Sequence, residues 1–314
     1  MTEHTNNEAA LGFWPDTVAC WQQLPNKSFF FPLLLAWLAL FQFLGNSILG
    51  YVHSSSIFEW LNYDYSLVGS DDSHGYLIPF IVAGLFWWKR RELLALPIRV
   101  WWPGLLITGF ALLMHITGFV TQQPRISLVA MFLGIYGLMG LAWGWAWLKS
   151  SIFPFWLFLF CVPVASLATA LTFPLRLFVT WLVAGAAHLL AIDVTRVGTQ
   201  LISPGGGFQY DVAAACSGMH SLIAVFLLAT VYGFVMFRSP GRRLLFMVMA
   251  LPLAVVGNFI RLLLIILAAE FFGKPAGDYV HENGFLSMIP YIPAIVGLLL
   301  MGRWLEKKAE EPAE

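Results

Sequence analysis

The sequence predicts an all-α membrane protein, a polytopic bundle of about eight transmembrane helices with an extracytoplasmic interfacial or re-entrant segment before the helix that carries Cys216. Of its 314 residues, 59% are hydrophobic and only 11% are charged, whereas a soluble domain is about one quarter charged. The apolar residues also gather in runs of about 20, the length of helix that crosses a bilayer core about 30 Å thick. These two observations exclude a soluble globular chain.

Eight apolar runs follow one another, each bounded by polar or turn-forming residues. The second run is the shortest, and we expect its helix to continue while Lys89, Arg90 and Arg91 reach back to the interface. The eight predicted spans are 30–50, 75–88, 101–120, 126–148, 152–173, 218–237, 244–272 and 285–302.

The distribution of Lys and Arg predicts the orientation, because short cytoplasmic loops are enriched in both. The eight spans place twelve of the seventeen basic residues on one side, which predicts that both termini are cytoplasmic. The predicted domains are a cytoplasmic tail over 1–29, a transmembrane catalytic domain over 30–302 and a charged cytoplasmic tail over 303–314. Glu3 and Glu8, without a basic n-region, indicate that the first span is not a cleaved signal peptide.

The stretch 174–192 is apolar enough to form a ninth span. A ninth span would move Arg238, Arg242 and Arg243 to the outside and put Arg176 and His188 in lipid. We therefore interpret this stretch as the interfacial or re-entrant segment. A turn over 204–207 and a short extended piece over 208–212 follow it.

Charge and cysteine content exclude further classes of function. Seventeen basic residues balance seventeen acidic ones, so no net field attracts nucleic acid. The cysteines Cys20, Cys161 and Cys216 are too few and too scattered for a disulfide framework or a CxxC metal site. The loop 71–76 holds two aspartates and His74 and is interpreted as a helix cap. We predict neither a metal nor a cofactor.

Cys216 stands apart from the other two cysteines because Ala-Cys-Ser-Gly opens a predicted helix. The free amides of that helix start, with Ser217 and Gly218, would lower the pKa of the thiol and could hold an oxyanion. Cys161, in the middle of an apolar span, is interpreted as a core side chain. From context alone, a nucleophilic and an inert Cys216 are about equally supported.

Arg261 and His281 are predicted at the same outer side as Cys216. A guanidinium in an apolar helix costs several kcal/mol unless it faces a polar cavity, so Arg261 either serves a polar site or snorkels to the interface. Asn258, one turn earlier, would share its face and orient it. His281 is expected in a loop. The competing histidines are His74, His115, His188 and His220.

The ordered set Ala-Cys-Ser-Gly, Asn-Phe-Ile-Arg and a later His, with Ser-His-Gly-Tyr-Leu-Ile-Pro leading a span, resembles the exosortase/archaeosortase family. The resemblance covers most of the chain. It implies a membrane cysteine transpeptidase, a protease-like enzyme of the bacterial inner membrane. Its substrates would be membrane-anchored exported proteins with a C-terminal sorting signal of PEP-CTERM type, transferred to an unknown lipid or glycan acceptor.

The resemblance also implies a role for individual residues. Cys216 corresponds to the nucleophile, Arg261 to the conserved arginine and His281 to the third catalytic residue, in the bacterial form. We expect Asn258, Ser217, Gly218 and His74 to support them.

The chain departs from common exosortases at Ala213-Ala214-Ala215 and at Met219-His220, which leaves the exact sorting motif open. The alternatives are a membrane carrier or scaffold without catalytic activity and an intramembrane hydrolase without transfer.

Overall fold

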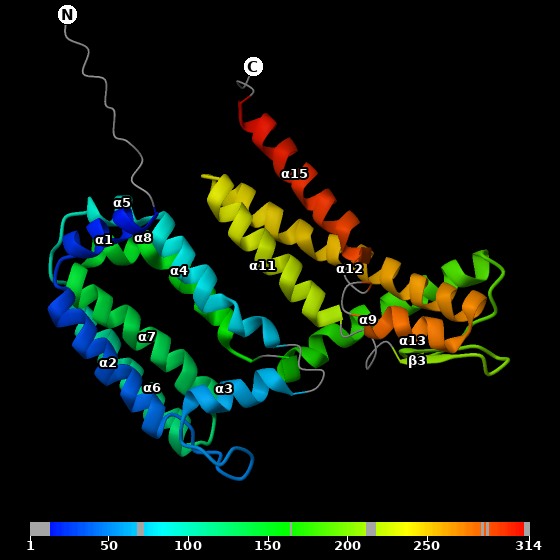
Figure 1. Cartoon of the computed structure of the whole chain (residues 1–314), viewed down its shortest axis with the longest axis horizontal. Coiled ribbons are helices and arrows are strands. Elements are labelled where there is room, and N and C mark those ends of the chain that lie inside the picture. Colours follow the sequence, from blue (N-terminus) through cyan, green and yellow to red (C-terminus); the bar gives the residue numbers. More distant parts are fainter. Residues whose placement is uncertain are drawn as a thin grey trace, which may run out of the picture. The chain divides into compact units, whose positions relative to one another are not determined.

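The computed structural model of the chain describes residues 13–67, 72–163, 165–211, 218–283, 286 and 289–310. The described chain is mostly helical, as the sequence predicts, and it divides into two compact units, residues 1–163 and 164–314 (Figure 1). Each unit is described here by itself.

Unit 1 is a helical bundle around α7. The central helix α7 is largely buried, since it packs against α2 and α6 and meets α8 after a break at Gly144. Small residues allow the closest approach: a Cβ at Gly104 of α6 would lie 2.5 Å from the carbonyl oxygen of Gly137 in α7. The elements are α1 (Phe13–Gln23), α2 (Lys27–Leu44), α3 (Ile57–Ser66), η1 (Ser73–Tyr76), α4 (Ile78–Trp88), α5 (Arg90–Leu94), α6 (Pro103–Val120), α7 (Pro124–Trp143), α8 (Trp145–Trp156) and η2 (Leu157–Cys161).

Unit 2 combines long helices with a small sheet. The strands form an antiparallel sheet of order β1-β2-β3, with Arg196 opposite Leu201 and Leu201 opposite Tyr210. The first hairpin turns at Gly198, whose φ of 62° favours glycine. The elements are α9 (Ala165–Leu189), β1 (Thr195–Val197), β2 (Gln200–Ile202), β3 (Gln209–Asp211), α11 (Gly218–Met236), α12 (Pro240–Phe272), α13 (Lys274–Glu282), η3 (Ile289–Tyr291) and α15 (Ile292–Glu310).

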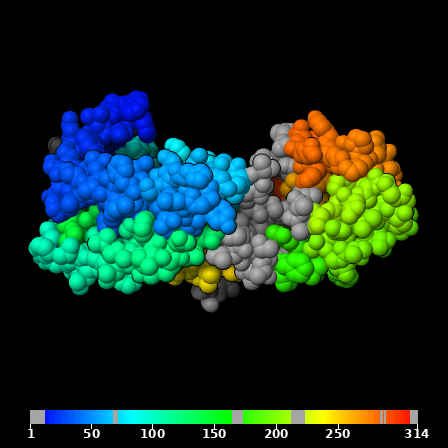
Figure 2. All heavy atoms as spheres, turned by 90° about the horizontal axis from the view of Figure 1, so that it is seen from below, coloured from blue at the N-terminus to red at the C-terminus, as the bar shows by residue number. Residues whose placement is uncertain are grey.

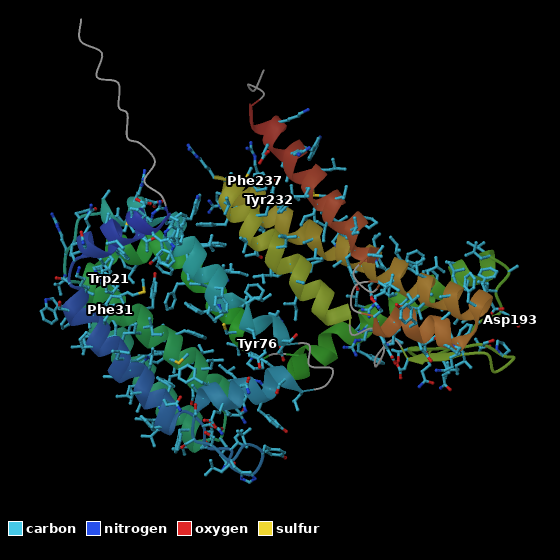
Figure 3. All side chains as sticks on the ribbon, in the orientation of Figure 1. Trp21, Phe31, Tyr76, Asp193, Tyr232 and Phe237 are labelled. Carbon is cyan, nitrogen blue, oxygen red and sulfur yellow. The ribbon has the colours of Figure 1, made fainter. Side chains whose placement is uncertain are left out.

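Two separate cores hold unit 2 together. One core joins α11, the first half of α12 and α15, and includes Phe237 and Phe246, against which Tyr232 packs; Figure 3 labels Tyr232 and Phe237 at that end of the bundle. The other joins α9, the sheet and the second half of α12, with Leu201 and Ile266 fully buried. In Figure 2 the strand region and the α13 region lie against each other at one end of unit 2. We call this second body of residues, α9, β1–β3, 262–272 and α13, the cap.

Five helices of the described chain are long and apolar enough to cross a membrane: Lys27–Leu44, Pro103–Val120, Pro124–Trp143, Pro240–Phe272 and Ile289–Lys307. They coincide with the predicted spans one, three, four, seven and eight. The predicted sixth span matches α11, and the predicted second span is represented by the 11 residues of α4. The total of eight spans stays a prediction.

The predicted fifth span, 152–173, is not one helix. Helix α8 ends at Trp156, η2 ends at Cys161, and Val162 is extended before Pro163, because a residue that precedes proline disfavours the helical conformation. The next helix, α9, then runs without a break through Pro174, where the sequence predicted a boundary. The predicted segment 174–192 is therefore mostly the second part of α9. The predicted turn at 204–207 is confirmed by the β2–β3 hairpin, and the predicted extended piece 208–212 includes strand β3, while residue 212 lies outside the described residues.

The predicted tails contain ordered helix. Helix α1 lies within 1–29 and contacts α5, and α15 extends to Glu310, beyond the predicted boundary at 302. Asp72 takes the N-cap position of η1, as expected for a cap, but makes no side-chain capping hydrogen bond to it.

We predict that Gly277→Ala destabilises the cap. A Cβ at Gly277 would lie 2.2 Å from Tyr210 Oη and 2.8 Å from Ala269 Cβ, so α13 would have to move away from β3 and α12. Overpacking of this kind costs about 1–3 kcal/mol, which should lower the thermal midpoint of the purified protein. Gly185→Ala is the matched control, because an added Cβ there meets nothing within 4 Å. Equal midpoints for the two variants would contradict the packing.

Candidate active site

Arg261 lies about one bilayer thickness from the basic start of its own helix. It is 18 residues beyond Arg243, or about 27 Å at 1.5 Å per residue. The sequence left Arg261 deep in an apolar run, and the structure places it directly before the part of α12 that belongs to the cap. Residues 262–272 continue into the cap core.

The start of α11 lies at a similar height. Helices α11 and α12 are antiparallel neighbours joined by a short turn at 237–239. Gly218 lies about 30 Å from that turn and Arg261 about 35 Å, again at 1.5 Å per residue. The N-terminus of α11 therefore approaches the level of Arg261. Cys216 and Ser217, the predicted nucleophile and its neighbour, precede Gly218 and lie outside the described residues.

His281 comes next to Arg261 because the chain reverses at Gly273. That glycine has φ 83°, which only glycine adopts readily, and Lys274 and Pro275 then open α13. Figure 1 shows α13 beside the second half of α12. Arg261 Nη2 donates to the carbonyl oxygen of His281 at 3.5 Å. The expectation that His281 lies in a loop is wrong: it is in the last turn of α13.

Two nitrogens of this pair are left for another partner. Arg261 Nε and His281 Nδ1 are both buried, and neither has a hydrogen-bond partner among the described residues. Buried polar atoms normally have such partners. Two buried nitrogens without partners, on two residues that contact each other, are therefore typical of a ligand site.

The electrostatic environment keeps His281 neutral. Burial lowers the pKa of His281 below its ordinary value of 6.5, and the cation of Arg261 lowers it further. The carboxylates of Glu282 and Asp278 act in the opposite direction but do not prevail. At neutral pH the imidazole is therefore unprotonated and able to accept a proton.

Asn258 does not orient Arg261 as the sequence predicted. It is 7% exposed, and its Oδ1 accepts a hydrogen bond from Tyr291 Oη at 3.4 Å. Within the described chain no hydrogen bond joins Asn258 to Arg261. Gly257 allows the ring of Tyr291 to approach, since a Cβ there would lie 2.5 Å from Tyr291 Cδ1. Asn258 instead ties α12 to the chain before α15.

Sequence reasoning missed the groups that anchor α13. Tyr210 Oη of β3 donates to Asp278 Oδ1 at 3.2 Å, and Lys274 Nζ contacts Asp278 Oδ2 at 2.6 Å. These bonds hold the pKa of Asp278 below its ordinary value. Lys274 and Asp278 are four residues apart, and Gly273 and Pro275 lie where a helix begins. This pattern is typical of a helix, and it could have predicted that His281 is helical. The contribution of Tyr210 required the sheet.

The remaining histidines differ in their hydrogen-bond partners and in the unit to which they belong. His115 Nδ1 lies 3.1 Å from Ser127 Oγ inside unit 1, and His188 Nε2 lies 2.8 Å from the carbonyl oxygen of Val194. Both have structural partners. His74 lies in η1, in unit 1, whereas Arg261 and His281 belong to unit 2. The side chain of His220 lies outside the described part. Among the described residues no group of three His, Cys, Asp or Glu side chains is placed to bind a metal.

One comparison with known proteins finds a match. The family model described as transmembrane exosortase (Exosortase_EpsH) matches residues 60–301, about three quarters of the chain, including every predicted site residue. No curated protein and no solved structure gives a significant match.

Proposed function

The chain belongs to the transmembrane exosortase family, and from this premise we propose that it is a membrane cysteine transpeptidase. It would cleave a C-terminal sorting signal from exported, membrane-anchored proteins and transfer the new carboxyl end to an acceptor, a lipid or a glycan. One observation carries the proposal: Arg261 and His281 lie together, each with a buried nitrogen that has no partner among the described residues, near the level at which the helix after Cys216 begins.

In the proposed reaction, His281 takes the proton of the Cys216 thiol, and the resulting thiolate attacks the scissile carbonyl carbon and forms a tetrahedral oxyanion. Arg261 donates to that oxyanion, a contribution worth about 3 kcal/mol for one good donor. The C–N bond then breaks, and the imidazolium of His281 gives its proton to the leaving amine. This leaves a thioacyl enzyme. The acceptor nucleophile attacks the thioester, His281 takes the acceptor's proton, and the Cys216 thiolate leaves.

The supporting residues have graded roles in this proposal. The backbone amides of Ser217 and Gly218, at the start of α11, would share the oxyanion and lower the pKa of the thiol. Asn258 would act through the position of α12, given its bond to Tyr291. His74, half-buried in η1, is proposed as a supporting residue on the family resemblance alone.

The proposed orientation follows the basic residues. Arg238, Arg242 and Arg243 lie at the end of the α11–α12 hairpin opposite to Arg261, which supports a site on the extracytoplasmic face and cytoplasmic termini. The site would then meet exported substrates after translocation, in the inner membrane and among its lipids.

The nucleophile is tested by substitution. We predict that Cys216→Ala abolishes cleavage of a tagged protein that carries a PEP-CTERM-type sorting signal, because no thioester can form. Cys161→Ala is the matched control, since that side chain is 4% exposed in unit 1 and should leave cleavage unchanged. Cleavage and membrane abundance are both measured on immunoblots. Retained cleavage by an abundant Cys216→Ala protein would refute the covalent mechanism.

Arg261→Lys separates an oxyanion donor from a snorkelling cation. Lysine also carries a charge on a long stem, so insertion should be normal, but it lacks the planar fork. We predict a loss of about 100-fold in the cleavage rate, at the lower end of the loss caused by removing one oxyanion donor. Arg196→Lys on the exposed strand β1 is the control and should cleave normally. Near-normal cleavage by Arg261→Lys would assign Arg261 a structural role.

The lowered pKa of His281 predicts the acid side of the pH profile. Because burial and Arg261 disfavour the imidazolium, His281 stays a base as the pH falls through 6.5. We expect the acid limb of kcat/KM to lie below pH 6.5 and to move lower still in Glu282→Gln, which removes a carboxylate that favours the imidazolium. The check is cleavage by purified protein across pH 4.5–8. An acid limb above 6.5 would contradict the assignment of His281 as the base.

A further inference from the structure

Unit 1 contains an apolar cavity that the proposed reaction does not use. It has a volume of about 400 Å³ and lies under α1, between this helix and α2, α4, α5, α7 and α8. Its walls are almost entirely apolar. The aromatic side chains among them are Trp21, Phe30, Phe31, Phe86, Trp87, Trp143 and Trp147. Figure 3 labels Trp21 and Phe31, two rings 5.0 Å apart, at this side of unit 1.

The volume and the walls limit the occupant. Water needs two to four polar partners in a cavity, and these walls offer very few. A single flexible hydrocarbon chain fits both the volume and the apolar surface.

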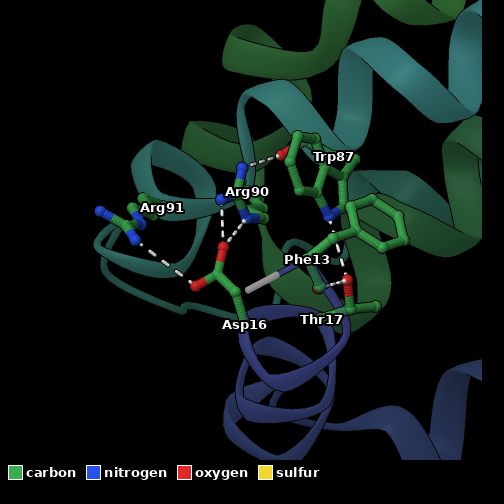
Figure 4. A network of polar contacts seen from close by, with 6 residues as sticks. All are labelled: Phe13, Asp16, Thr17, Trp87, Arg90 and Arg91. Carbon is green, nitrogen blue, oxygen red and sulfur yellow. Dashed lines mark hydrogen bonds and ion pairs between the residues drawn. The ribbon is translucent and has the colours of Figure 1, made fainter. Parts of the chain in front are cut away.

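An excess positive charge lies beside this cavity. Arg90 lines it, donates from Nε to Asp16 Oδ2 at 2.8 Å and lies over the ring of Trp87, with its Cζ 3.8 Å from the centroid. Arg91 Nη2 contacts the other oxygen of Asp16 at 3.4 Å (Figure 4). Two guanidinium groups therefore share one carboxylate. The Arg91 side chain is 65% exposed, so its remaining donors face outward.

The same end of unit 1 has the properties of a membrane interface. Its described charged residues are six basic and two acidic: Lys27, Lys89, Arg90, Arg91, Arg99, Lys149, Asp16 and Glu92. Helix α1 presents Phe13, Trp14 and Val18 to the outside, each more than half exposed, as amphipathic helices do at a bilayer surface. Basic residues at such a surface attract anionic lipid, at about 1 kcal/mol each.

One cavity residue also lacks a partner. Trp147 is 5% exposed, and its indole N–H has no acceptor among the described residues. Two other tryptophans of the same cavity do have one: Trp87 donates to Thr17 Oγ1 at 3.2 Å and Trp143 to the carbonyl oxygen of Pro25 at 2.8 Å. A buried N–H without an acceptor is uncommon in a folded protein and is consistent with a bound molecule that supplies the acceptor.

We propose that this cavity is a specific site for an anionic phospholipid, with one acyl chain among the aromatic rings and the phosphate at Arg91. The site is independent of Cys216, Arg261 and His281, so it stands or falls separately from the proposed reaction.

The experiment uses the full chain in nanodiscs of equal phosphatidylglycerol and phosphatidylcholine, released into native mass spectrometry. We expect one retained phosphatidylglycerol per chain. Cys20→Trp, which fills the cavity from α1, should reduce that adduct at least tenfold, whereas Val18→Trp on the exposed side of the same helix should keep it. Arg91→Gln should keep a lipid but bind phosphatidylglycerol and phosphatidylcholine equally.

Each substitution also has a result that would contradict the proposal. Equal lipid retention by Cys20→Trp and Val18→Trp would overturn the site. A series of adducts with increasing numbers of both lipids would also overturn it, because it would mean that lipid binds only at the protein surface. A retained preference in Arg91→Gln would overturn the assignment of the phosphate. Leu24→Phe, a smaller filling substitution at the same cavity, repeats the test and should also reduce the adduct, with the thermal midpoint measured alongside to show that the variant folds.

Discussion

Helix α12 is longer than a bilayer core is thick, and the arrangement of unit 2 depends on that mismatch. Its 33 residues extend about 50 Å, against about 30 Å of hydrocarbon. The last part of that length is still apolar, with Leu262, Ile265 and Ile266 almost fully buried under other protein segments. Helix α9, the three-stranded sheet and α13 provide that cover. Arg261 lies where the two environments meet.

The position of Arg261 affects both the cost of its own charge and the protonation of its neighbour His281. In the hydrocarbon a guanidinium would cost several kcal/mol, and fully in water it would have little influence on its neighbours. At the junction it stays charged and disfavours protonation of His281. The anchoring of α13 through Tyr210, Asp278 and Gly277 keeps the two residues in this relation. The proposed acyl transfer needs this combination of a charged donor and a neutral base.

Unit 1 follows the same physical rule at its basic end. Arg90 and Arg91 share Asp16 beside a cavity lined by aromatic rings, and α1 turns further aromatic residues outward. Aromatic and basic side chains gather at membrane interfaces because their apolar parts favour the acyl region and their polar groups the headgroups. The proposed lipid site is a local consequence of that preference, at an apolar pocket between α1 and the helices around it.

The sequence by itself determined the helical membrane class and the positions of α6, α7, α11 and α12, because apolar runs are local properties. Which residues act in the proposed reaction stays a prediction from the family resemblance. Only the tertiary structure decided that α9 continues through Pro174, that His281 lies beside Arg261 and that Asn258 bonds Tyr291. Those outcomes depend on contacts between segments far apart in the chain, such as Tyr210 with Asp278, which no local pattern specifies.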